Sequence, residues 1–236
     1  MLKIIVGLSL VAGSAFASSA LVGTSSDSYF QIGSVTVQEA KTDISALNLD
    51  LTNMSDCTQA APLADETGVL DDVGVSLDKI INIGKKVWDI VAKGKPVVSL
   101  KTDVAHALPA GVTCWRDLTN WSMPQAKTYE VSYKNVYGFE VVHFSYRVVY
   151  TSGGSFKNTG KYLTQATIMP ANVYVAWGFQ LDALAEVPLV MNMGSVESPV
   201  AGMQLDMKWK VTSPLAESQM TESYAISGDG TFKSLH

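Results

Sequence analysis

Apolar and polar side chains alternate along much of the chain between Tyr129 and Val211. The pattern is clearest from Met203 to Val211, where every second residue is apolar and the residues between are Gln, Asp or Lys. A β-strand directs successive side chains to opposite faces, whereas a helix would scatter the same residues around its axis. The alternation therefore predicts a strand with one face in a core and the other in water.

Similar patterns predict further strands. In the first half they fall at 30–37, with a bulge at Gly33-Ser34, at 47–51 and at 97–102. In the second half they fall at 129–133, 139–151, 156–168, 173–181, 187–193, 203–211 and 222–227, with Ser152-Gly-Gly-Ser155 as one turn. Parallel strands would need a helix at each crossover, and these segments are joined by turn signals. The order of elements favours an antiparallel β-sandwich.

Residues 76–93 follow a different period. Apolar residues recur there at steps of three and four, which predicts an amphipathic α-helix. Ser76 suits its N-cap, Gly94 suits the position after its C-terminus, and Pro96 ends it. The predicted fold is mainly β: an antiparallel β-sandwich with this one amphipathic helix packed on it and one disulfide.

The first residues are typical of a secretory signal peptide. Lys3 precedes an apolar run at 4–11, and Ala15-Phe-Ala17 forms a small-x-small cleavage site. We expect 1–17 to be the signal peptide, 18–28 a flexible arm and 29–236 a single β-sandwich domain. Whether the first third is a separate domain stays open. The expected location is extracellular, at the cell surface or in the periplasm.

Cys57 and Cys114 are the only cysteines. An even pair in an exported protein predicts a disulfide, here closing around the expected helix. The loop is long, so the chain-entropy model gives a stabilisation of about 4 kcal/mol. Two thiolates and three scattered histidines do not suggest a metal site, and no cofactor is expected.

Charge and motifs argue against several functions. The net charge is −5 with no basic run, which argues against nucleic acid as a partner. No G-x-S-x-G motif is present, and Ser76 with Lys79 matches S-x-x-K while being better placed as a helix cap. An enzyme is not expected. Dispersed carboxylates leave no spacing signature, so a glycan-processing hydrolase stays an alternative.

Two surfaces are candidates for binding. Trp115 and Trp121 occur in loop-like sequence, where aromatic residues contribute to recognition of a protein or glycan partner. The predicted helix, with an apolar stripe beside lysines, is a candidate for membrane contact. The residues that would make that contact are Ile80, Ile81, Lys85, Lys86, Val87 and Trp88.

The sequence thus predicts an exported, non-catalytic binding, adhesion or assembly module of the cell envelope or extracellular space. The alternative is a membrane-active protein, pore-forming or lipid-binding, that uses the amphipathic helix. Self-association and the identity of the partner are left open.

Overall fold

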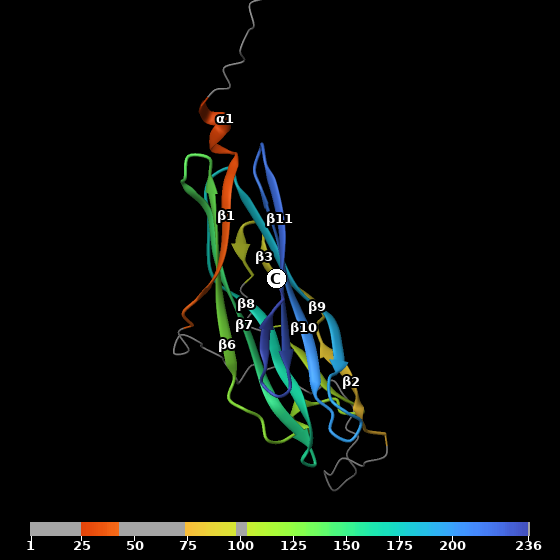
Figure 1. The fold of residues 1–236 in the computed structure, drawn as a ribbon. Coiled ribbons are helices and arrows are strands. Elements are labelled where there is room, and N and C mark those ends of the chain that lie inside the picture. Colours follow the sequence, from red (N-terminus) through yellow and green to blue (C-terminus); the bar gives the residue numbers. More distant parts are fainter. Residues whose placement is uncertain (1–24, 43–73, 98–102, 236) are drawn as a thin grey trace, which may run out of the picture.

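The computed structural model describes residues 25–42, 74–97 and 103–235. Within these ranges the chain forms two antiparallel sheets that face one another in an elongated sandwich (Figure 1). The first sheet contains, in spatial order, β1 (Ile32–Ala40), β6 (Gln125–Asn135), β7 (Glu140–Phe156), β8 (Thr159–Val175), β5 (Ala105–Ala110) and β2 (Ser76–Gly84). The second contains β12 (Phe232–Ser234), β11 (Glu217–Ser227), β10 (Ala201–Thr212), β9 (Gln180–Asn192), β3 (Val87–Ala92) and β4 (Lys95–Pro96).

The described residues contain little helix. A short helix α1 (Ser25–Tyr29) precedes β1, and a 3₁₀ helix η4 (Trp115–Asp117) precedes β6. The predicted mainly β, antiparallel architecture is therefore confirmed. The predicted strand at 47–51, Cys57 and the signal peptide lie outside the described residues.

Strand β10 shows why alternation was informative. Its apolar residues Met203, Leu205, Met207, Trp209 and Val211 are all buried against the first sheet. The indole Nε1 of Trp209 donates a hydrogen bond of 2.9 Å to the hydroxyl of Tyr133 on β6. The polar tip of this large buried ring is thus satisfied where the two sheets meet.

Tyrosines fill the core between the sheets. The hydroxyls of Tyr146 on β7 and Tyr224 on β11 lie 2.6 Å apart, and the ring centroids of Tyr129 and Tyr224 lie 4.8 Å apart. Burial, followed by the nearby carboxylates Glu39 and Glu222, raises the pKa of Tyr129 to about 12. The core therefore favours neutral tyrosines.

The helix predicted over 76–93 is wrong, because these residues form β2 and β3 in different sheets. Gly84, with φ of 111°, ends β2, and the chain then crosses to the second sheet. In β3 the buried residues Trp88 and Ile90 alternate with the exposed Val87 and Asp89. Buried and exposed residues therefore alternate, as in a strand, within the segment whose apolar spacing predicted a helix.

Two turns also differ from the prediction. Ser152 to Ser155 lies within β7, and the β7–β8 turn is formed by Lys157 and Asn158, whose φ angles are 48° and 62°. Positive φ at both central residues is the geometry of a two-residue hairpin. The predicted strand 173–181 is likewise broken by a turn at Trp177-Gly178, where Gly178 has φ of 82°. The predicted bulge in the first strand is confirmed by a register shift between Ile32 and Ser34.

Candidate functional site

Three turns, two of them hairpins and one a connection between the two sheets, lie at the same end of the sandwich as α1 (Figure 1). They are the β6–β7 turn at 136–139, the β8–β9 turn at 176–179 and the β10–β11 turn at 213–216. The β7–β8 and β9–β10 hairpin turns join the other ends of these antiparallel strands, so they lie at the opposite end of the sandwich.

Phe30 and Gln31, between α1 and β1, contact all three turns. The carbonyl of Gln31 accepts a hydrogen bond of 3.2 Å from the amide of Val136, and the carbonyl of Phe30 accepts one of 2.7 Å from the hydroxyl of Ser213. The ring of Phe30 packs against Trp177, with centroids 5.6 Å apart. These contacts join the three turns into one surface.

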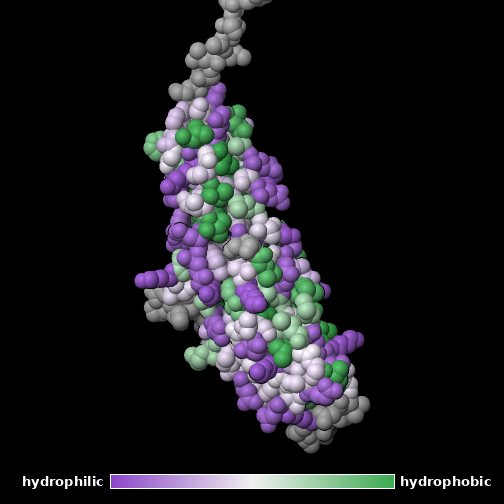
Figure 2. Space-filling view, viewed as in Figure 1, coloured by the Kyte–Doolittle hydropathy of each residue, from purple (hydrophilic) through white to green (hydrophobic). Residues whose placement is uncertain are grey.

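This surface exposes large apolar side chains. The indole of Trp177 is 81% exposed and the ring of Phe139 is 64% exposed. We define the aromatic end as Val136, Tyr137, Phe139, Tyr174, Trp177 and Leu215, of which the other four are each about half exposed. Figure 2 shows hydrophobic side chains among hydrophilic ones at this upper end of the molecule. Exposed apolar side chains gathered in this way make the aromatic end a candidate interaction site.

Asn135 holds the β6–β7 turn. Its side-chain oxygen accepts hydrogen bonds from the amides of Tyr137 and Phe139, at 3.1 and 3.0 Å, and its side-chain amide donates to the carbonyl of Tyr29 at 3.3 Å. Asn135 is 2% exposed. Asparagine commonly stabilises turns by bonding to backbone groups a few residues on. The rings of Tyr137 and Phe139 are therefore presented by a turn with a fixed backbone.

Charges beside the aromatic end are balanced. Lys134 and Glu140 occupy paired positions on β6 and β7. Glu140 also accepts a hydrogen bond from Ser132, and Lys210 lies 2.8 Å from Glu217 next to the β10–β11 turn. Exposed apolar side chains, rather than a concentration of positive charge, therefore distinguish this end.

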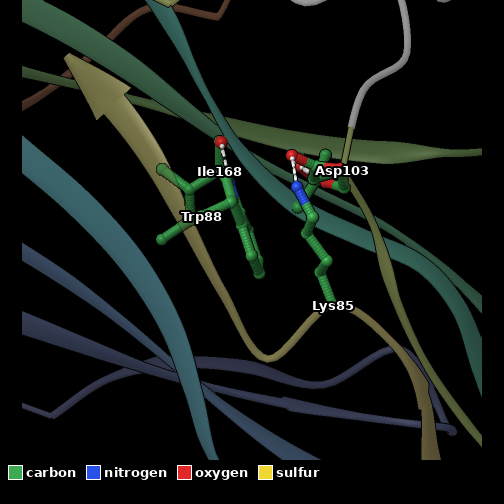
Figure 3. Close-up of polar contacts among 5 residues, drawn as sticks. Lys85, Trp88, Asp103 and Ile168 are labelled. Carbon is green, nitrogen blue, oxygen red and sulfur yellow. Dashed lines mark hydrogen bonds and ion pairs between the residues drawn. The ribbon is translucent and has the colours of Figure 1, made fainter. Parts of the chain in front are cut away.

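A second candidate is a cavity of about 310 Å³ between the two sheets. Trp88 of β3 forms part of its wall and donates its indole N–H to the carbonyl of Ile168 on β8, at 3.1 Å (Figure 3). Two carboxylates, Asp89 and Asp103, also line it. Glycoside hydrolysis needs two available carboxylates. Asp103 is held by Lys85 at 2.8 Å, so this arrangement does not favour that chemistry (Figure 3).

A third candidate is His106 on β5. Its Nδ1 lies 2.7 Å from the hydroxyl of Thr164 and accepts a hydrogen bond from the amide of Gln165 at 3.4 Å. Gln165 has φ of 55° within β8, at a point where the register with β5 shifts. Burial lowers the pKa of His106 to about 4. Both His106 and Thr164 are buried, so this pair packs the sheet and is not open to a substrate.

The predicted binding residues Trp115 and Trp121 lie near the end opposite the aromatic end, and both are partly buried. The indole of Trp121 donates to the carbonyl of Trp115 at 3.2 Å, and its ring lies against Gly154 of β7.

Cys114 caps η4, where its sulfur accepts a hydrogen bond from the backbone amide of Arg116. Because Cys57 is outside the described residues, the disulfide stays a prediction.

The residues of the predicted membrane-contact helix do not form one face. Ile80 and Ile81 are on β2 of the first sheet, whereas Val87 and Trp88 are on β3 of the second. Between them lie Lys85 and Lys86, and of these Lys85 is paired with Asp103. The helical stripe is therefore corrected to two strands that share no surface.

Sequence reasoning missed the aromatic end itself. Its signal was a large apolar residue beside a turn former, as in Gly138-Phe139, Trp177-Gly178 and Pro214-Leu215. Such residues project outward only where the chain turns between two strands. Around Trp177 the sequence predicted one continuous strand, whereas the chain turns there and passes from β8 in the first sheet to β9 in the second.

Within the described ranges no cluster of histidine, cysteine, aspartate or glutamate could hold a metal ion. No helix among the same residues combines the length and apolar character needed to cross a membrane. No protein-family model matches the chain. Comparison with curated proteins gives no significant match, and comparison with solved structures gives none either. Function is therefore argued from the geometry.

Proposed function

We propose that the protein is an exported, non-catalytic binding module of the cell envelope or extracellular space, and that it binds through the aromatic end. The observation that carries this proposal is the outward projection of Trp177, Phe139 and Leu215 from three turns joined by Phe30 and Gln31. The signal peptide at 1–17 and the disulfide between Cys57 and Cys114 belong to the same proposal.

Energetics support this reading. Burying a large apolar side chain contributes about 1.5–3 kcal/mol. A few such anchors, placed near the centre of an interface, account for most of the affinity of many protein complexes. The backbone of the β6–β7 turn is already fixed by Asn135, so little ordering entropy is lost on binding. The aromatic end thus combines large side chains with a low cost of ordering them.

Binding to intact cells tests the proposal. The fluorescently labelled protein is incubated with a panel of bacterial, yeast and mammalian cells, and the bound fraction is measured by flow cytometry. The variant Phe139→Ser/Trp177→Ser should lose at least tenfold in apparent affinity for any cell type that binds the parent protein. Far-UV circular dichroism and thermal unfolding verify that the variant is folded.

The matched control changes apolar residues at the other end. Met193 and Val196, in the β9–β10 connection, are 60% and 66% exposed. Met193→Ser/Val196→Ser removes comparable exposed apolar surface and should bind as the parent does. If the control loses binding as much as the Phe139→Ser/Trp177→Ser variant, or if no cell type binds the parent, the aromatic end is not the binding surface.

A further inference from the structure

We infer that the partner of the aromatic end is the lipid–water interface of a bilayer, which the protein contacts peripherally with its long axis directed toward the membrane. The inference rests on the proposed function and names the partner of that same surface. It replaces the predicted helix, whose residues lie on two strands of different sheets.

The shape of the surface favours a fluid partner. Trp177, Phe139 and Leu215 each project from a different turn, and each is more than half exposed. A protein partner would need a separate depression in register with each side chain. Lipids rearrange around protruding side chains, so a bilayer interface accommodates them without a matching shape.

The residue types suit the same partner. Trp and Tyr rings combine an apolar body with a polar atom and concentrate at the headgroup level of membranes. Phe and Leu prefer the hydrocarbon just below. The aromatic end has both kinds, with Trp177, Tyr137 and Tyr174 beside Phe139 and Leu215.

Local charge sets the expected lipid preference. Lys134 occupies the position paired with Glu140, Lys210 lies beside Glu217, and Asp27 of α1 adds a negative charge, so positive charge does not dominate. Binding to anionic lipid through basic residues is strongly weakened by salt. The aromatic end should instead bind zwitterionic phosphatidylcholine, with little dependence on salt.

The position of the aromatic end makes this contact accessible. It lies at one extremity of an elongated sandwich, next to α1 (Figure 1). A flat surface approaching this end along the long axis would meet α1 and the three turns rather than the sides of the sheets (Figure 1). This geometry predicts shallow insertion of turn residues, with both sheets remaining folded in water.

Trp177 provides a built-in reporter. All five tryptophans lie in the described residues, and Trp88 and Trp209 are buried while Trp115 and Trp121 are partly buried. With unilamellar phosphatidylcholine vesicles, Trp177 emission should shift to the blue and should be quenched by phosphatidylcholine brominated on its acyl chains. Trp177→Phe should keep binding in a flotation assay but lose most of the spectral change.

Vesicle flotation gives the affinity. Phe139→Ser/Leu215→Ser, which leaves the packing of Trp177 on Phe30 in place, should lower the partition coefficient by about tenfold or more. Met193→Ser/Val196→Ser should leave it within twofold. Binding at 50 mM and 500 mM NaCl should agree within about twofold.

Three results would overturn the inference alone, and a fourth would overturn the proposed function with it. The first is no association with vesicles of phosphatidylcholine, alone or with phosphatidylserine, while cells still bind through the aromatic end. In that case the partner is a protein or glycan and the proposed function stands.

The second is binding only to vesicles with phosphatidylserine and its loss at high salt, which would mean electrostatic attraction elsewhere on the surface. The third is equal loss of vesicle binding in the Met193→Ser/Val196→Ser control. If neither vesicles nor cells bind, the inference and the proposed function both fail.

Discussion

Acidification should destabilise the protein through His106. The pKa of the imidazole is lowered by burial from 6.5 to about 4 in the folded state. As the pH falls from 6.5 toward 4, the unfolded chain binds a proton at this residue and the folded chain does not. Unfolding therefore becomes more favourable throughout this window. Stability from this group is fully present above pH 6.5 and is lost progressively below it.

The size of the effect follows from the difference in pKa. Each pKa unit corresponds to about 1.4 kcal/mol, so the unfolding free energy at pH 4.5 should be about 2–3 kcal/mol lower than at pH 7.5. The full figure applies because the side chain is only 5% exposed. The local contacts agree with the direction, since Nδ1 already accepts a hydrogen bond from the amide of Gln165. Protonation of Nδ1 would turn this acceptor into an N–H donor that faces the N–H of Gln165.

Urea unfolding at pH 7.5 and pH 4.5 measures the effect. His106→Gln removes the titrating group and should reduce the drop in unfolding free energy between the two pH values by about 2–3 kcal/mol. The comparison is between the two proteins' drops in unfolding free energy from pH 7.5 to pH 4.5. Any constant destabilisation by the substitution cancels within each drop, and carboxylates that titrate in the same pH range contribute equally to both.

A direct titration guards against a poorly folded variant. In the parent protein, the NMR signals of the His106 ring should stay those of a neutral imidazole down to about pH 4.5, well below the pKa expected for an exposed histidine. If the ring titrates near pH 6.5 in the folded protein, or if the parent and His106→Gln show the same drop, the reasoning is refuted.

Three further substitutions or conditions test other parts of the structure. Asn135→Ala should lower the unfolding free energy by about 2–3 kcal/mol, because three partly buried hydrogen bonds, to the amides of Tyr137 and Phe139 and the carbonyl of Tyr29, are lost; thermal unfolding that matches the parent's would contradict this. Gly154→Ala places a methyl group 2.2 Å from the ring of Trp121, so it should destabilise by about 1–3 kcal/mol, and less when Trp121→Ala is also present; an additive double mutant would argue against this contact. Tyr129 and Tyr162 have pKa values raised to about 12, mainly by burial, so stability should fall as the pH rises above 10. Tyrosinate absorbance that appears fully at pH 10 without unfolding would be the contrary result.

Strand β10 was predicted well because its apolar residues alternate with polar ones. Met203, Leu205, Met207, Trp209 and Val211 are buried as expected, and the exception is Asp206, which was expected in water and is buried as well. Residues 76–93 misled because Ile80, Val87 and Val91 fit helical steps and also fit two strands. The density of β-branched residues was the discriminating signal, since isoleucine and valine suit strands more than helices.

The aromatic end depended on information that a single sequence does not contain. Trp177 was expected on the apolar face of a continuous strand, but the chain turns there and passes from β8 in the first sheet to β9 in the second. Its neighbour Phe30 is far away in sequence. Hydrophobic periodicity identifies which faces are buried, but it does not say which turns meet at one end of a fold.

The bond between the hydroxyl of Ser213 and the carbonyl of Phe30 spans 183 residues. Closure over such a separation is slow, because the entropy of a long loop is lost before the contact forms. A ribosome makes the chain from its amino terminus, so Phe30 emerges early and this contact closes only after nearly all the remaining residues have been added. The end of the sandwich that carries Trp177 and Leu215 would therefore be among the last parts of the molecule to reach its final structure.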